Sequence, residues 1–147
     1  HLNKIPLQKI ILTYMLRNIS YNNPKIKKEI LKMIGDTYTL FERIKMNGIG
    51  SSSLKIKTSS SEIQNLLDLD NNDNCCNIEI RKNGIIIRFR SLLETYGLII
   101  PFYKLKLFKG ESNVYSIYID KYFIKVLVDK KKDHQYFKKI LNIKNSN

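Results

Sequence analysis

The sequence has 147 residues, 43% of them hydrophobic and 27% charged, a composition that excludes a wholly disordered chain and suffices for one domain with a hydrophobic core. A formal net charge of +13 and a pI of about 9.7 suggest an anionic partner, such as nucleic acid or a membrane surface. Lysine outnumbers arginine by 21 to 5, however, and isoleucine and asparagine are also abundant, so compositional bias is a competing explanation of the charge.

Three helices are predicted in the first third of the chain. Apolar residues at mixed spacings of three and four indicate an amphipathic helix over 5–18. A second helix over 24–34 begins at Pro24, which suits a first helical turn, and ends before Gly35. Residues 37–46 favour a third helix, although the first three of them would equally suit a strand.

The Gly- and Ser-rich stretch 47–53 is the expected boundary in the chain. It separates an N-terminal helical segment, 1–50, from a β domain with a C-terminal helix, 51–147. The second half is predicted to open with a strand over 54–58. Ser59 and Glu62 then match a capping box, which predicts that a helix begins there.

Beyond the polar loop at 70–77 the apolar period changes to two, the period of half-buried strands. Five strands are predicted from this pattern: 77–82, 85–91, 98–109, 114–120 and 122–128. The last element, 133–144, places Phe137, Ile140 and Leu141 on one helical face. This helix follows the strands directly, so we expect it to pack against the sheet.

The first predicted hairpin has a two-residue turn of type I′ at Asn83-Gly84. In this register Lys82 faces Ile85, Ile80 faces Ile87 and Ile78 faces Phe89. These apolar pairs define the buried side of the hairpin. On the solvent side Glu79 faces Arg88, with Arg81 and Arg90 beside them. The prediction is a curved sheet that is apolar inside and cationic outside.

Several segments of the second half carry a family resemblance. They are IPFYKLKLF at 100–108, YSIY at 115–118, YFIKV at 122–126 and QYFKKIL at 135–141. Over about residues 54–145 the chain resembles small uncharacterised bacterial proteins with a pleckstrin-homology-like (PH-like) domain. The resemblance implies an α+β fold: a PH-like antiparallel sheet or barrel with a C-terminal helix, here preceded by a short helical segment.

The same resemblance implies a candidate anion-binding site. Some PH domains bind phosphoinositide headgroups through a lysine followed by a basic-x-basic triplet on the first hairpin, and Lys82 with Arg88-Phe89-Arg90 has this form. Cations that converge from a rigid hairpin suit a phosphate group. The expected site residues are Arg81, Lys82, Arg88 and Arg90, with Lys104 and Lys106 as a second cationic strip. A solvated hairpin face is the competing interpretation.

Two other binding modes remain open at this point. The helices predicted within 24–46 match a helix-turn-helix, so a DNA-binding protein is the alternative function. Tyr115, Tyr118 and Tyr122 alternate near lysines, as in a stacking platform for single-stranded nucleic acid, although core packing explains them equally. A protein partner, joined through the first helix or an open sheet edge, is a third class.

Catalysis is not expected from this sequence. Its two histidines, His1 and His134, accompany no serine, cysteine or carboxylate in a recognisable catalytic order. No metal or cofactor is expected, because the adjacent Cys75 and Cys76 lack further ligands at metal-binding spacing. Their presence as unpaired thiols favours a reducing, cytoplasmic setting. The apolar run within 5–19 is too short to span a bilayer and has no cleavage-site pattern.

Overall fold

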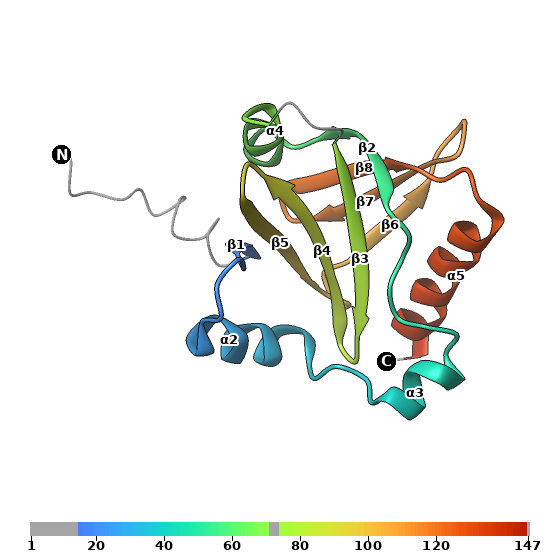
Figure 1. Ribbon diagram of the computed structural model, residues 1–147. Coiled ribbons are helices and arrows are strands. Elements are labelled where there is room, and N and C mark those ends of the chain that lie inside the picture. The colour runs from blue at the N-terminus through green and yellow to red at the C-terminus, as the bar shows by residue number, and fades with distance from the viewer. Residues whose placement is uncertain (1–14, 71–73, 147) are drawn as a thin grey trace.

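The computed structural model describes residues 15–70 and 74–146, and within them the fold is α+β (Figure 1). Its eight strands form one antiparallel sheet in the order β1-β5-β4-β3-β2-β8-β7-β6, so the sheet is open, with β1 and β6 at its edges. The strands are β1 (Leu16–Asn18), β2 (Leu54–Ser59), β3 (Cys75–Arg81), β4 (Gly84–Ser91), β5 (Glu94–Pro101), β6 (Lys106–Lys109), β7 (Val114–Ile119) and β8 (Tyr122–Leu127). The helices are α2 (Pro24–Ile34), α3 (Leu40–Lys45), α4 (Ser61–Asp68) and α5 (Lys131–Ser146).

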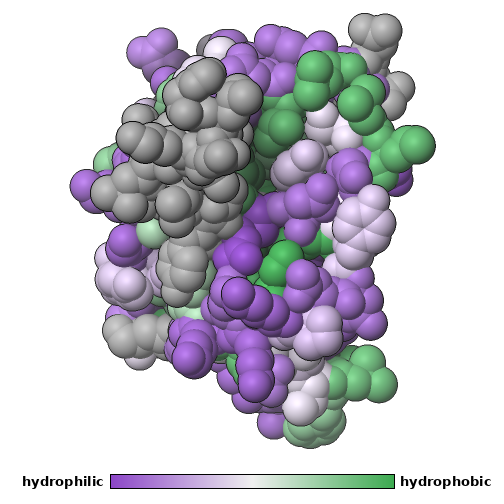
Figure 2. All heavy atoms as spheres, turned by 90° about the vertical axis from the view of Figure 1, so that its left-hand side faces the viewer, coloured by the Kyte–Doolittle hydropathy of each residue, from purple (hydrophilic) through white to green (hydrophobic). Residues whose placement is uncertain are grey.

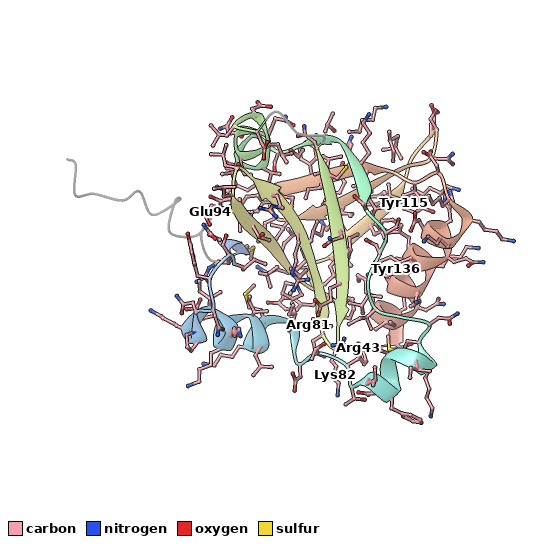
Figure 3. All side chains as sticks on the ribbon, viewed as in Figure 1. Arg43, Arg81, Lys82, Glu94, Tyr115 and Tyr136 are labelled. Carbon is pink, nitrogen blue, oxygen red and sulfur yellow. The ribbon has the colours of Figure 1, made fainter. Side chains whose placement is uncertain are left out.

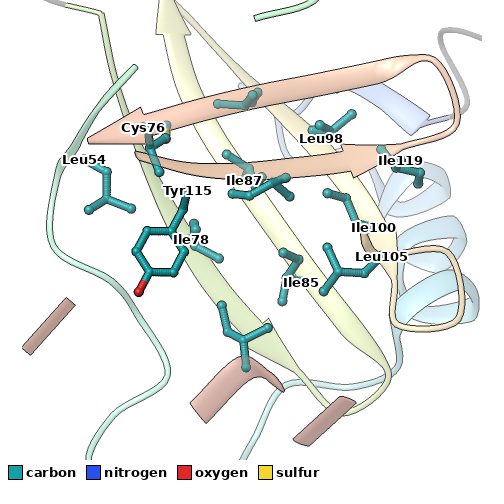
Figure 4. Packing of buried hydrophobic residues seen from close by; sticks show 14 of the residues in the cluster. Leu54, Cys76, Ile78, Ile85, Ile87, Leu98, Ile100, Leu105, Tyr115 and Ile119 are labelled. Carbon is teal, nitrogen blue, oxygen red and sulfur yellow. The ribbon is translucent and has the colours of Figure 1, made fainter. Parts of the chain in front are cut away.

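The sheet folds over on itself into two layers. The meander β3-β4-β5 forms one layer, the meander β6-β7-β8 crosses behind it, and β2 joins them by pairing with both β3 and β8 (Figure 1). The register of β2 against β8 shifts between Ile56 and Thr58, and such an irregularity lets one strand bend between two layers. The main core lies between the layers (Figure 4).

The predicted faces of the first hairpin are confirmed. Ile78 and Ile80 of β3 and Ile85 and Ile87 of β4 are all buried in the main core, and Phe89 joins them. The alternation produces this arrangement because side chains of a strand point to opposite faces in turn. The opposite face is apolar as well in one place, where Ile30 and Ile34 of α2 cover Ile86 and Ile99 in a second cluster. Strands β4 and β5 are therefore buried on both faces beneath α2.

The predicted type I′ turn, by contrast, is wrong. The turn residues are Lys82 and Asn83, Gly84 is already the first residue of β4, and Ile80 faces Ile85 rather than Ile87. Backbone hydrogen bonds from the α2–α3 connection select this register: Asn83 N donates to Ile34 O at 2.7 Å, and Lys82 N donates to Asp36 O at 3.3 Å. The partners move by two residues, an even number, so every side chain keeps its predicted face.

The predicted strand over 98–109 is two strands with a turn between them. The turn buries both Phe102 and Leu105, three residues apart, which one extended strand cannot place on the same face. Leu105 N donates to Pro101 O and Phe102 O and so closes the turn. The other predicted strands are present within one or two residues of their expected ends, and the C-terminal helix is α5.

Near the N-terminus the helix predicted over 5–18 is wrong for residues 16–18, which form β1 and pair with β5. Residues 1–14 lie outside the described part of the chain. Since β1 is a strand of the sheet and α2 packs on β4 and β5, residues on both sides of the predicted boundary at 50 share one structure. Pairing with a free sheet edge decided the conformation of this short segment, which local periodicity cannot reveal.

Two helix starts also differ from prediction. Helix α3 spans only 40–45, because Thr39 caps it in a capping box with Glu42. Helix α4 is capped at Ser60, and the capping box predicted for Ser59 and Glu62 is absent. The Ser60 side chain instead bonds the backbone of Phe123 in β8, which ties the start of α4 to the sheet.

Helix α5 covers one end of the space between the layers and inserts Tyr136, Phe137 and Ile140 into the main core (Figures 1 and 3). The buried Tyr136 hydroxyl lies 2.8 Å from Ile49 O and 2.9 Å from Ile78 O. Its one proton is shared between these two carbonyls, at the point where residues 49–51 run beside β3. The hydroxyl therefore fastens α5 to the sheet.

We expect Tyr136→Phe to lower the free energy of unfolding by about 1 kcal/mol, the net value of a buried hydrogen bond. The loss stays small because both carbonyls keep backbone donors, Ile80 N and Ser51 N. Tyr122→Phe is the matched control, since the buried Tyr122 hydroxyl has no hydrogen-bond partner among the described residues. The control variant is expected to be as stable as the wild type or more so in urea unfolding. Equal losses in both variants would contradict the assignment.

Candidate anion-binding surface

All five arginines of the sequence lie on one side of the molecule, the outer face of the β3-β4-β5 layer and the segment beside it. We call this set the arginine face: Arg17 of β1, Arg43 of α3, Arg81 of β3, and Arg88 and Arg90 of β4. Three of them belong to the β3–β4 hairpin, and Arg17 and Arg43 come from elements remote from it in the sequence. Arginine is the less common cation in this chain, so its concentration on one face is a property of the fold.

Strand register places two of these arginines in one row across the sheet. Arg88 faces Asn77 on β3 and Gly97 on β5, and Gly97 in turn faces Arg17 on β1. Side chains of paired residues point to the same face, but the space above Gly97 in this row is filled by Ile19 and Ile86. Arg17 pairs with Glu29 of α2, with Nη1 2.5 Å from Oε2.

Glu79 holds two further arginines together. Its carboxylate accepts from Arg81 Nε at 2.5 Å and from Arg88 Nη1 at 2.7 Å, and its side chain is 19% exposed. Burial by itself raises the pKa of Glu79, but the hydrogen bonds and charges of Arg81 and Arg88 outweigh burial and hold that pKa below its usual value. The predicted contact between Glu79 and Arg88 is confirmed, although in the observed register they are diagonal neighbours.

Arg43 reaches the same place from α3. Its guanidinium donates to Tyr38 O and to Thr37 Oγ1, both at 2.9 Å, and these bonds fix its position. A hollow of about 340 Å³ brings together Arg43, Asn77, Glu79 and Arg88. Figure 3 shows Arg43 and Arg81 at the lower end of the layer, on either side of the β3–β4 turn region. Arg43 was not among the predicted site residues.

A second hollow of about 540 Å³ continues from the first, since Asn77 and Arg88 line both. Arg90, Ser53 and Thr95 add polar side chains to it, and the exposed hairpin residues Leu92 and Leu93 form its rim. We call the two hollows together the arginine cleft. Figure 2, viewed from the side of β1 and α2, shows polar side chains over the middle of the face and hydrophobic side chains above and below them.

The cleft keeps hydrogen-bond donors for a ligand. Arg90 is exposed and makes no hydrogen bond or ion pair with the residues that the structure describes. Arg88 uses Nη1 for Glu79, and the other N–H groups of its guanidinium make no hydrogen bond to the described residues. Among the described residues that line the two hollows, the acids are Glu79 in the first and Asp70 in the second. The cleft is therefore suited to an anion.

Of the other predicted site residues, Lys82 lies beside Arg81 and Arg43, whereas Lys104 and Lys106 lie apart from the arginine face (Figure 3). Lys82 lies in the β3–β4 turn, where its Nζ is 3.8 Å from Glu42 Oε1 and above the Tyr38 ring. Lys104 lies in the turn after β5 and pairs with Asp120 at 3.3 Å. Lys106 is exposed on β6, the edge strand of the other layer. Arg81, Arg88 and Arg90 stay together, whereas the Lys104 and Lys106 strip lies elsewhere.

The segments considered for nucleic acid have other contacts. Helix α2 is present as predicted and buries Ile30 and Ile34 against the sheet, while α3 is short and uses Arg43 for local bonds. Of the three tyrosines, Tyr115 and Tyr122 are buried and belong to the main core. Their core interpretation is confirmed. The alternative of DNA binding through 24–46 stays a prediction.

No family model, no curated protein and no solved structure matches this chain. Among the described residues no helix has both the length and the apolar character needed to cross a membrane. The same part of the chain has no cluster of His, Cys, Asp or Glu side chains arranged to hold a metal ion.

Proposed function

We propose that the protein is a non-enzymatic interaction module that binds a phosphorylated ligand in its arginine cleft. The observation that carries the proposal is that three of the five arginines, Arg43, Arg88 and Arg90, line one continuous cleft on a face that also holds the other two. Compositional bias toward lysine accounts for a basic surface, but it gives no reason for the scarce guanidinium groups to meet. Guanidinium groups match phosphate oxygens with two parallel N–H donors, which an ammonium group cannot do.

The chemistry of the cleft supports this ligand class. Arg88 and Arg90 lie two residues apart on β4 and point to the same face, so both can reach one phosphate group. Asn77 and Thr95 add uncharged donors beside them. Glu79 orients Arg88 through Nη1, and Arg88 lines both hollows of the cleft. A phosphate monoester would bring the negative charge that this site lacks.

For the fold we propose the PH-like class. Two packed antiparallel meanders and a C-terminal helix over one end of the core support that assignment. Helix α4 and strand β1 are additions that the resemblance does not imply. We also place the protein in the cytoplasm, because Cys75 and Cys76 are free thiols, which suit a reducing compartment.

A titration of isotope-labelled protein with three probes tests the proposal. The probes are inositol hexakisphosphate, phosphatidylcholine vesicles that contain a phosphoinositide, and a short DNA duplex. We expect amide shifts centred on Asn77 and Arg88 to Arg90 with the inositol phosphate, weakening as salt rises. Binding only to vesicles would assign a lipid surface as the source of the phosphate. Shifts confined to 24–46 with the duplex would overturn the proposal in favour of DNA binding.

Paired charge removals separate the cleft from general basicity. The double variant Arg88→Gln with Arg90→Gln is expected to weaken inositol hexakisphosphate binding about tenfold or more, since two charge-assisted contacts are lost. The control, Lys106→Gln with Lys109→Gln, removes the same charge from exposed positions on β6. Only a small loss is expected from the control. Equal losses would show that the net charge alone attracts the anion.

A further inference from the structure

Helix α3 presents an apolar surface that the rest of the described structure leaves open. Leu40, Phe41 and Ile44 are 74%, 66% and 70% exposed, and no residue of the helix is buried. Single exposed apolar residues are common on proteins, but three on one short helix form a contiguous patch, and such patches mark interaction sites. We call these three residues the α3 patch.

The fold fixes this helix without using the α3 patch. Thr39 and Glu42 cap its N-terminus, and Arg43 anchors it to Thr37 and Tyr38. At the other end Lys139 of α5 donates to Gly48 O at 2.9 Å, just after the chain reverses. Because the helix is held from its polar side, Phe41 and Ile44 contribute little to its position. A preformed helix also binds at a smaller entropic cost than one that must order.

The rim of the α3 patch is cationic. Lys45 Nζ lies 4.7 Å from the centre of the Phe41 ring, and Lys82 and Lys139 lie at the two ends of the helix. Glu42, the acid within the helix, already accepts from Thr39 N and pairs with Lys82. Hydrogen bonding to Thr39 holds the pKa of Glu42 below its usual value, so Glu42 is ionised and engaged at neutral pH. With three lysines against one acid, the net charge around the patch is positive.

Two properties of the chain argue against a second copy as the occupant. A net charge of +13 on each chain repels another copy. A stable dimer also buries roughly 800 Å² on each partner, far more than three side chains supply. A short amphipathic helix needs a smaller contact, since a few apolar anchors at helical spacing carry its binding energy.

We propose that the α3 patch docks an amphipathic, acidic segment of another protein. Apolar side chains of that segment cover Phe41 and Ile44, and its carboxylates meet Lys45 within the net positive rim. The α3 patch lies outside the arginine cleft, so a phosphorylated ligand and this partner segment occupy separate surfaces.

Selection from a library of short random peptides displayed on phage tests the docking site. Peptides are selected on the wild-type protein and counter-selected on the double variant Phe41→Ser with Ile44→Ser. Both substitutions are at exposed positions, so thermal unfolding of the variant should match the wild type. The control is Leu92→Ser with Leu93→Ser, which removes equally exposed apolar residues at the hairpin tip.

We expect the wild type to enrich peptides with apolar residues at helical spacing and an excess of Asp and Glu. A synthetic copy of such a peptide should shift amides of 38–48 and bind at least tenfold more weakly to the Phe41→Ser, Ile44→Ser variant. The Leu92→Ser, Leu93→Ser control should bind as the wild type does.

Enriched peptides without an acidic excess, or no peptide that binds the wild type better than the Phe41→Ser, Ile44→Ser variant, would overturn the proposal. A dimer in light scattering that the variant loses would overturn it as well. The phosphate test changes Arg88 and Arg90, whereas the peptide test changes Phe41 and Ile44. A failure of inositol hexakisphosphate binding would therefore leave the peptide-binding result unaffected.

Discussion

The Gly84→Ala variant is expected to lose about 3 kcal/mol of unfolding free energy, the upper range for overpacking of a core. An added Cβ at Gly84 would lie 2.4 Å from Ile100 O and 2.4 Å from Ile34 Cγ2. The first of these is backbone of the paired strand β5, so no rotation of a side chain relieves the contact. Either β4 and β5 separate there or α2 moves away from the sheet, and both changes open the second cluster.

Urea unfolding of Gly84→Ala with Gly50→Ala as control measures this effect. Gly50 runs beside β3, the other strand of the hairpin to which Gly84 belongs. A Cβ at Gly50 would meet only Ile78 O, at the ordinary distance of 3.9 Å. Its substitution is expected to change stability by less than about 1 kcal/mol, in either direction, because alanine also restricts the unfolded chain. If Gly84→Ala is as stable as the control, the close approach of α2 to the β3–β4 hairpin is incorrect.

The second large effect is expected for Glu79→Gln, about 2 kcal/mol of lost stability at neutral pH. The substitution leaves Arg81 and Arg88 beside each other without the carboxylate that both contact. Because the pKa of Glu79 is lowered by folding, its ionised form stabilises the native state at any pH above the unfolded pKa, about 4.5. This stabilisation is lost as the pH falls through the native pKa.

The difference between the wild type and Glu79→Gln should therefore shrink in acid. Urea unfolding at about pH 7 and about pH 3 gives the two values to compare. Glu111→Gln is the control, since Glu111 is exposed and its side chain has no bond to the described residues. The control should unfold as the wild type does at both values. A constant difference for Glu79→Gln across this range would contradict the ion-pair role of its carboxylate.

The elements that the sequence predicts well are those whose pattern repeats locally. Isoleucines at every second position of β3 and β4 determine which face is buried, and Pro24 with Gly35 marks both ends of α2. The hairpin register did not follow, because an Asn-Gly pair favours a type I′ turn only when no other contact competes. Here the carbonyls of Ile34 and Asp36 bind the turn, and they belong to an element remote in the sequence.

The candidate site was likewise predictable only for residues that a local pattern brings together. Arg81, Arg88 and Arg90 belong to one hairpin, so strand alternation alone assigns them to a common face. Arg17 and Arg43 join them only through the pairing of β1 with β5 and the position of α3, which no local pattern encodes. Lys104 and Lys106 were predicted as a second cationic strip on one continuous strand, but the turn at 102–105 separates them and leads the chain to the other layer.

Strand β2 has a consequence for the order in which the chain acquires its structure. Strands β3, β4 and β5 meet through short hairpins, as do β6, β7 and β8, so each meander can form early from neighbouring residues. Strand β2 instead pairs with β8 across nearly the whole second half of the chain, through contacts such as Lys55 with Leu127. Closing so long a loop before its contacts form slows folding. The two meanders are joined into one sheet only when this pairing is made, so we expect docking of β2 on β8 to follow the formation of the meanders.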